Sequence, residues 1–159
     1  MTLAHKDIAP PVGTLRFVAS DKGLVAILWP NERPGRVPLG PTQADEAHPI
    51  LVRAAAQVTD YFAGGLRAFD VSLDFRGTDF QRSVWQALLT IRFGETRSYA
   101  QIARQMGRPP ATPPAGAANG RNPVSIIAPC HPAIGTSGAL TGFAGGPEAK
   151  RMLLDLEAA

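Results

Sequence analysis

The sequence contains one cysteine, Cys130, in 159 residues. A single cysteine excludes a disulfide within the chain, and one thiolate is too few for a cysteine-rich zinc site. This cysteine usage fits a reducing compartment, so we expect a cytoplasmic protein. His5 and His48 fall outside the segments expected to form strands and helices. We therefore expect both to be solvated loop residues, and we expect no metal site.

Long apolar runs are also missing. No run approaches the roughly 18 residues of a membrane-spanning helix, and the first residues lack the apolar core of a signal peptide. Hydrophobic residues make up 45% of the chain, which is ordinary for a globular protein. The formal net charge of +3 is compatible with a polyanionic partner but does not require one. We expect a soluble protein without membrane contact, built as one large domain or two small ones.

The N-terminal part predicts a small sheet with a helix against it. Residues 14–19 and 24–29 are strand-like and are joined by a turn sequence, which predicts a hairpin. Residues 30–49 are rich in proline and predict a loop. Residues 50–62 have helical spacing, and residues 69–75 alternate as a strand does. The segment carries no evident chemistry.

The C-terminal part predicts helices. Thr78 with Gln81, and Ser98 with Gln101, are capping boxes at the starts of two helices. The second of these helices, residues 99–106, is closed by Gly107. In the first helix one face is apolar, and Trp85 on this face is expected to belong to the core. The residues of the face are Phe80, Val84, Trp85, Leu88 and Leu89.

A short helix of small residues, 115–118, is predicted next, with Thr112 as its cap and Pro113 in its first turn. A helix, a turn and a short helix make a helix-turn-helix candidate. A last helix starts at about residue 147, with Met152, Leu153 and Leu156 as its core face.

The fold class predicted is therefore α/β (α+β). Residues 1–76 form a small N-terminal domain of sheet, helix and loop. Residues 77–159 form a helical C-terminal domain that contains the helix-turn-helix and has an all-helical core.

Cys130 stands between two prolines at the end of residues 123–132, an apolar run that predicts a short buried strand. The prolines restrict the backbone on both sides, which suits a nucleophile held in one orientation. His131 is adjacent, but neighbours in a strand point to opposite faces, so a bridging water is as plausible as a direct hydrogen bond. The competing interpretation is an inert buried thiol.

Three segments together resemble the active-site region of the O6-alkylguanine-DNA alkyltransferases, which are single-turnover DNA repair proteins. They are Asn119-Gly120-Arg121-Asn122-Pro123, Pro129-Cys130-His131 and residues 134–146. The likeness extends from about Phe75 to Glu157, which is half of the chain. It implies that an alkyl group passes from O6-alkylguanine in double-stranded DNA to Cys130, once per molecule and without a cofactor.

The resemblance also implies roles for five residues in catalysis. Tyr99 would donate a proton to the base, and Asn122 would orient the thiol and its turn. Glu157, with His131 and a water, would withdraw the proton from Cys130. From the residues alone, Tyr99 is equally a core aromatic and Glu157 equally a frayed terminal residue.

In the family the second helix of the unit enters the minor groove and the damaged base is flipped into a pocket. The DNA contacts implied are Ser98, Thr112, Pro113, Pro114, Ala115, Gly116, Ala117 and Arg121, and the base pocket implied is Tyr99, Phe143, Ala144 and Gly145. A set of arginines could contact phosphates, or could simply form a solvated face. They are Arg92, Arg97, Arg104, Arg108 and Arg121.

The chain departs from the family at two positions. Pro132 stands where the family has the arginine of Pro-Cys-His-Arg, and Pro113 stands where the family has the arginine that fills the gap left by the flipped nucleotide. Both departures favour an alternative, a lesion-binding protein of the same fold with weak or lost transfer. A Cys-His hydrolase is a third possibility, but it lacks an oxyanion motif and a second catalytic histidine. The prediction is the alkyltransferase, acting as a monomer.

Overall fold

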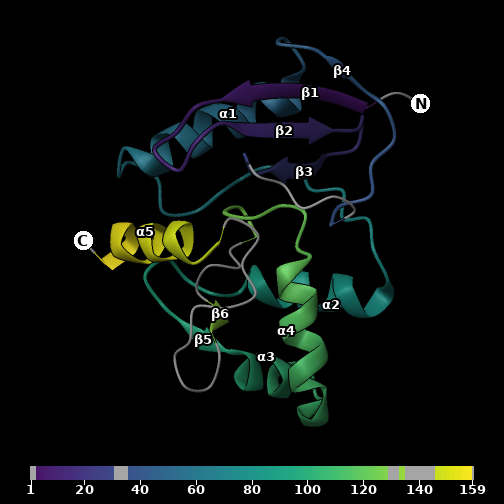
Figure 1. Cartoon of the computed structure of the whole chain (residues 1–159), viewed down its shortest axis with the longest axis vertical. Helices are drawn as coiled ribbons and strands as arrows, with labels where there is room; N and C mark the ends of the chain where they lie inside the picture. Colours follow the sequence, from purple (N-terminus) through teal and green to yellow (C-terminus); the bar gives the residue numbers. More distant parts are fainter. Residues whose placement is uncertain (1–2, 31–35, 129–132, 135–145, 159) are drawn as a thin grey trace. The chain divides into compact units, whose positions relative to one another are not determined.

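The structure is a computed structural model, and it describes residues 3–30, 36–128, 133–134 and 146–158. The chain divides into two compact units, Met1–Arg76 and Gly77–Ala159. The first unit holds a sheet and a helix, and the second is mainly helical (Figure 1). The predicted mixture of α and β structure is confirmed. No helix in the described part of the chain is long and apolar enough to cross a membrane.

The first unit is built on a four-stranded sheet with the strand order β3-β2-β1-β4. Its strands are β1 (Leu3–Ile8), β2 (Leu15–Ala19), β3 (Leu24–Leu28) and β4 (Thr42–Ala44). β2 pairs antiparallel with both β1 and β3, whereas β4 pairs parallel with β1. The predicted hairpin is confirmed as β2 and β3, because the alternating apolar residues and the turn between them are local signals.

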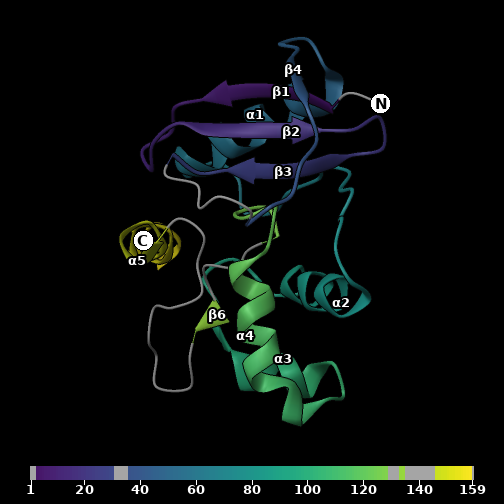
Figure 2. The ribbon, with the colours of Figure 1, turned by 45° about the vertical axis from the view of Figure 1, so that its right-hand side comes forward.

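Helix α1 (Pro49–Phe62) lies against one face of this sheet (Figure 2). Its apolar residues Leu51, Ala54 and Val58 are fully buried, as the helical spacing predicts. Val18 and Val25 of the sheet belong to a further buried cluster, which Val37 and Leu39 cover. Both β2 and β3 are therefore almost wholly apolar, as expected for strands that are covered on both faces.

Several predictions for the first unit are wrong. The segment 30–49 is not loop throughout, because it contains β4. Residues 69–75 make one isolated bridge, Leu24 with Leu73, instead of a strand. The backbone of Asp70 is held by side chains of α1 instead of a strand partner: Arg53 and Gln57 donate to its carbonyl, and Gln57 accepts from its N–H.

The two histidines of this unit are not solvated loop residues. His5 lies in β1, and its Nδ1 is 2.9 Å from Thr42 Oγ1 on β4. His48 caps α1, since its Nδ1 accepts a hydrogen bond from the N–H of Ile50 at 3.3 Å. A cap satisfies one of the backbone donors that a helix start leaves without an intrahelical partner. Both side chains therefore support the fold of the first unit.

The described residues of the second unit form five helical segments and a two-residue parallel ladder of β5 with β6. Their bounds are α2 (Asp79–Leu88), β5 (Arg97–Ser98), α3 (Tyr99–Gln105), the 3-10 helix η1 (Pro109–Ala111), α4 (Thr112–Gly120), β6 (Ala133–Ile134) and α5 (Gly146–Ala158). α4 packs against both α2 and α3. The prediction of an all-helical core is wrong, because β5 and β6 form this ladder. No local sequence pattern indicates their pairing.

Both predicted capping boxes are present. The Thr78 side chain accepts from the N–H of Gln81 while the Gln81 side chain accepts from the N–H of Thr78. Ser98 and Gln101 repeat this exchange at the start of α3. Trp85 is core, as predicted, and is 2% exposed. Its indole N–H donates to the carbonyl of Ala118 at 2.9 Å and so ties α2 to α4.

Four details of the second unit differ from prediction. The helix of small residues extends beyond 115–118, because α4 runs from Thr112 to Gly120 with Pro113 in its first turn, as predicted. Thr112 is its first residue and not its cap, since Ala111 holds the cap position and no side chain caps the helix. The apolar run from Pro123 forms turns over 123–128 and no strand. In α5, Met152 is 43% exposed instead of buried, while Leu153 is fully buried.

Candidate functional site

Helix α4 has one buried face and one exposed face. Ala115, Ala118 and Asn119 are buried, with relative exposures of 1%, 3% and 0%. Pro113 and Ala117 are exposed, as are Pro114 within the helix and Arg121 just after it. The exposed face thus presents small, uncharged side chains, with a cation at its C-terminal end. A helix with so little side-chain bulk can bring its backbone close to another surface.

Tyr99 is the first residue of α3, and its ring is packed against the buried side of α4. A Cβ added at Gly116 would lie 3.3 Å from Tyr99 Cδ2, so only a residue with minimal bulk fits there without a shift. The amide of Asn119 donates to the Tyr99 hydroxyl oxygen at 3.4 Å. Lys150 Nζ lies over the same ring, 5.9 Å from its centroid. Tyr99 itself is only 9% exposed.

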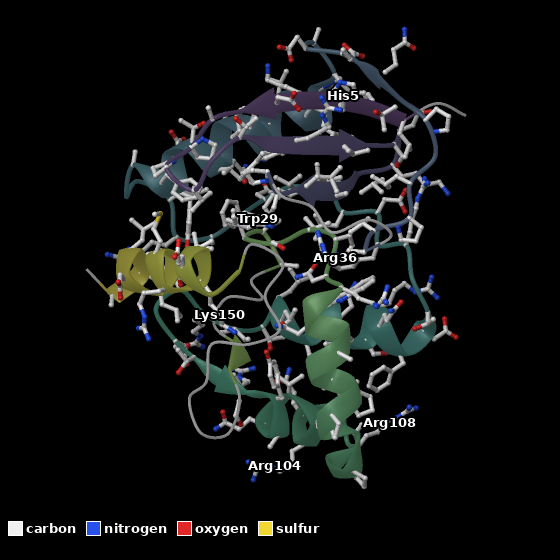
Figure 3. All side chains as sticks on the ribbon, viewed as in Figure 1. His5, Trp29, Arg36, Arg104, Arg108 and Lys150 are labelled. Carbon is white, nitrogen blue, oxygen red and sulfur yellow. The ribbon has the colours of Figure 1, made fainter. Side chains whose placement is uncertain are left out.

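Lys150 comes from α5 and is fully buried. Figure 3 shows its side chain extending from α5 toward the side of the unit that holds β5 and α3. A cation over an aromatic ring is attracted by the negative charge on the ring face. The three contacts on Tyr99, from Gly116, Asn119 and Lys150, therefore restrict its ring from two different helices.

Asn122 clamps the turn that leads to Cys130. Its Oδ1 accepts from the N–H of Val124 at 2.9 Å, and its amide donates to the carbonyl of Ala128 at 2.6 Å. The turn also holds Ile126 at φ +78°, which a β-branched residue rarely adopts. The Asn122 side chain is fully buried. These bonds explain why the apolar run turns instead of extending, and they fix the chain up to two residues before the cysteine.

Glu157 and Ser98 are both engaged with backbone groups. Glu157 Oε1 accepts from the N–H of Gly94 at 2.9 Å, which links α5 to the connector between α2 and β5. Ser98 Oγ accepts from the N–H of Gln101 at 3.1 Å in the cap of α3. Glu157 therefore helps to hold α5, which carries Lys150. Ser98 helps to hold the start of α3, which carries Tyr99.

The arginines around the unit fall into two groups. Arg97 donates to Thr90 Oγ1 at 3.0 Å and to Gln105 Oε1 at 2.6 Å, so it braces the start and end of α3. Arg92, Arg104, Arg108 and Arg121 are exposed. Figure 3 shows Arg104 and Arg108 at the end of the second unit where α3 and the start of α4 lie. This end of the unit is accordingly cationic.

Part of the predicted site lies outside the described residues. Cys130, His131, Phe143, Ala144 and Gly145 belong to it, as does the side chain of Thr112. The structure brings Tyr99 to the back of α4 and places Asn122 directly after that helix. Among the residues that the structure describes, no group of three histidine or acidic residues is placed to hold a metal ion.

Asn119 and Lys150 were not identified from the sequence. The signal for Asn119 is its spacing, because residues 115, 118 and 119 fall on one face of a helix and a polar side chain on the buried face needs a partner. The signal for Lys150 is similar, since it lies three residues before the buried Leu153. Neither pattern names the partner, which in both cases is Tyr99.

Comparison with known proteins agrees with this arrangement. The profile of a family described as "6-O-methylguanine DNA methyltransferase, DNA binding domain" matches residues 79–159. The methylated-DNA–protein-cysteine methyltransferase of Mycobacterium tuberculosis is 61% identical over 104 residues, which are 65% of this chain and 63% of that protein. The corresponding protein of Mycolicibacterium paratuberculosis is 43% identical over 157 residues, which are 98% of this chain and 92% of that protein.

The fold is similar as well. A crystal structure of Mycobacterium tuberculosis OGT in complex with DNA matches with a TM-score of 0.88 and 45% sequence identity, covering 98% of this chain and 92% of that chain. The similarity therefore includes both units and is not limited to the segment that the family profile matches.

Proposed function

Because the chain belongs to the family of methylated-DNA–protein-cysteine methyltransferases, we propose that it repairs DNA by moving an alkyl group from O6-alkylguanine to Cys130. The Cys130 sulfur attacks the alkyl carbon, a carbon–sulfur bond forms, and the carbon–oxygen bond to guanine breaks. Guanine leaves with the electron pair. A thioether is not hydrolysed by the residues present, so each molecule acts once and needs no cofactor.

Two proton movements accompany the transfer. The thiol must lose its proton, because the thiolate is the nucleophile. His131, a water and Glu157 are the route we propose for that proton. The leaving guanine must gain a proton on its ring as negative charge develops, and Tyr99 is the donor we propose. Asn122 holds the turn as far as Ala128, and the role we propose for it is to orient the thiol of Cys130.

The observation that carries the proposal is the contact of Tyr99 with Gly116. This contact supports the role we propose for Tyr99, because its ring lies directly behind α4, whose opposite face is exposed and small. In this proposal the flipped base passes this helix to reach the hydroxyl end of Tyr99. Extruding the base costs a few kcal/mol, which the DNA contacts must offset.

The DNA interface that we propose is the helix-turn-helix formed by α3 and α4. The exposed residues of α4, Pro113, Pro114 and Ala117, suit the minor groove, which is roughly 6 Å wide in B-form DNA. Ala115 and Gly116 allow the backbone to approach. Ser98 and Arg121 contact phosphates at the margins, and Arg104 and Arg108 add sequence-independent attraction.

Phe143, Ala144 and Gly145 complete the base pocket in this proposal, together with Tyr99. The partner is double-stranded DNA with an O6-alkylated guanine, which is flipped out of the helix when bound. The protein works as a monomer in the cytoplasm, where the Cys130 thiol stays reduced.

The test is incubation with duplex DNA that carries O6-methylguanine, followed by intact-mass measurement. We expect the mass of one methyl group on each protein molecule, and peptide mapping should place it on Cys130. Cys130→Ser should remain unmodified while it keeps its DNA affinity. A wild-type protein that binds the methylated duplex and gains no mass would instead be a lesion-binding protein. Transfer that persists in Cys130→Ser, or multiple turnover, would also contradict the proposal.

A further inference from the structure

Asn119 makes a hydrogen bond to the hydroxyl end of Tyr99. Its amide nitrogen is 3.4 Å from the Tyr99 hydroxyl oxygen, and the two residues are 20 positions apart, on α4 and α3. Asn119 is fully buried and Tyr99 is 9% exposed, so water competes little for this bond. A buried side-chain pair of this kind fixes geometry more strongly than an exposed pair does.

The direction of the bond matters for proton donation. A phenol hydroxyl can donate one hydrogen bond and can accept others. When the Asn119 amide donates to the phenol oxygen, the oxygen is the acceptor and Asn119 does not take up the phenol proton. We propose that Asn119 is a positioning residue that leaves the Tyr99 proton available to the leaving guanine. This inference rests on the proposed alkyl transfer.

The bond should also strengthen during the reaction. As Tyr99 gives its proton to the guanine ring, the phenol oxygen gains negative charge. A hydrogen bond to a charged oxygen is roughly twice as strong as a hydrogen bond to a neutral oxygen. The amide of Asn119 therefore stabilises the transition state more than the ground state, which is the condition for raising a rate.

Two further contacts keep the ring where Asn119 can act on it. Gly116 allows α4 to lie against the ring, with a Cβ position only 3.3 Å from Cδ2. Lys150 Nζ, 5.9 Å from the ring centroid, places positive charge on the side of α5. A positive charge at that distance also favours the negative charge that develops on Tyr99. Asn119, Gly116 and Lys150 thus act on one side chain from two helices.

The experiment measures single-turnover transfer from methylated duplex DNA by Asn119→Leu, Tyr99→Phe and the double variant. Each molecule reacts once, so the end-point counts competent molecules and the rate constant is independent of the unfolded fraction. We expect Asn119→Leu to lower the rate constant about tenfold, because this is the typical effect of losing one hydrogen bond to a charged group. In the Tyr99→Phe background it should cause no further decrease, because its partner is gone.

A second variant, Asn119→Asp, keeps the test valid if Asn119→Leu does not fold. Asn119→Asp has nearly the same shape, but its carboxylate accepts and cannot donate, so it draws the Tyr99 proton to itself. We expect its rate constant to fall at least as far as that of Asn119→Leu. A rate constant equal to that of the wild type in either folded variant would overturn the inference. So would an equal decrease with and without the Tyr99 hydroxyl.

Two controls separate positioning from packing. Trp85→Phe removes the bond to Ala118 and so loosens the same helix without touching Tyr99. We expect Trp85→Phe to lower the end-point of transfer or the melting temperature. Any effect of Trp85→Phe on the rate constant should be additive with the effect of Tyr99→Phe. Tyr61→Phe changes the other tyrosine, in the first unit, and should leave the rate constant unchanged. Absence of transfer in the wild type would overturn the proposed function itself, whereas an undiminished rate in Asn119→Leu overturns this inference alone.

Discussion

Glu157 and Gly94 are 63 residues apart, and the Glu157 carboxylate accepts a hydrogen bond from the Gly94 N–H at 2.9 Å. Gly94 has φ +82°, a conformation that suits glycine, and a Cβ there would lie 3.4 Å from the Glu157 carbonyl oxygen. The end of α5 is therefore anchored to the connector after α2. Glu157 has this structural contact in addition to the proton-accepting role that we propose for it.

The two roles of Glu157 can be separated by substitution. Glu157→Gln keeps an oxygen that accepts from Gly94 but removes the carboxylate, so we expect a nearly unchanged melting temperature and a slower transfer to Cys130. Glu157→Ala removes both and should lower the free energy of unfolding by about 1 kcal/mol as well. Thermal unfolding and single-turnover rates of both variants check this. Equal rates for Glu157→Gln and the wild type would leave Glu157 with the structural contact alone.

Asp74 gives the first unit a defined pH dependence. Burial alone would raise its pKa, but hydrogen bonds from Ser20 at 2.7 Å and Arg76 at 3.2 Å outweigh burial, and the pKa lies below its usual value. A carboxylate with a lowered folded-state pKa contributes stability above the unfolded-state pKa of about 3.9. That contribution is lost as the pH falls through the folded-state pKa.

We therefore expect Asp74→Asn to lower the free energy of unfolding at neutral pH by about 1 kcal/mol. Below the folded-state pKa the difference from the wild type should vanish. Denaturant unfolding of both proteins between neutral and acidic pH measures this. Asp21→Asn, at an exposed carboxylate next to Ser20 in the turn between β2 and β3, is the matched control. A difference between Asp74→Asn and the wild type that stays constant with pH would contradict the assignment.

The sequence resemblance predicts that Pro132 replaces a family arginine, and proline cannot make the ionic contacts that we expect of that arginine. We expect Pro132→Arg to stabilise the protein by about 1 kcal/mol, which is a rise of roughly 2–4 °C in melting temperature for a chain of this size. Thermal unfolding checks this, and transfer to Cys130 should persist in both forms. An unchanged or lower melting temperature would mean that other contacts already compensate for the proline.

The parts of the fold that sequence patterns predicted are those set by local interactions. Thr78 with Gln81 and Ser98 with Gln101 satisfy helix starts within four residues, so both capping boxes could be read directly. β1 and β4 were missed, because a parallel pair joins segments distant in sequence and His5 and Lys6 interrupt any alternation. Each of these strands depends on a partner that its own sequence does not indicate.

The candidate site shows the same division. Tyr99 and Asn122 were named through their motifs, but the strand predicted for residues 123–132 overlooked Asn122, whose side chain bonds Val124 and Ala128 and turns the chain. Asn119 was missed because its partner lies on another helix. Side-chain bonds between elements are tertiary contacts, and hydrophobic periodicity carries no information about them.

Pro113 lies in the first turn of α4 and is exposed. The sequence resemblance predicts that it replaces the family arginine that fills the gap left by the flipped nucleotide. A guanidinium can fill that gap and hydrogen-bond the orphaned base, whereas a proline ring can only fill space. We therefore expect Pro113 to slow the DNA step and to leave the chemistry at Cys130 intact. Free O6-benzylguanine, which needs no flipping, should react with Cys130 at a rate ordinary for the family.

Pro113→Arg tests this on both substrates. Proline is not required at this position, and an arginine in the first turn opposes the helix dipole by only about 0.3–1 kcal/mol, so the helix should tolerate the change. We expect faster repair of methylated duplex DNA and tighter binding, with little change toward O6-benzylguanine. Pro114→Arg is the matched control, because it adds the same charge one residue along on the exposed side of α4. If both variants gain equally, the gain comes from general attraction to phosphates. An equal change on both substrates in Pro113→Arg would place its effect in the base pocket, and flipping and chemistry would then not be separable at this residue.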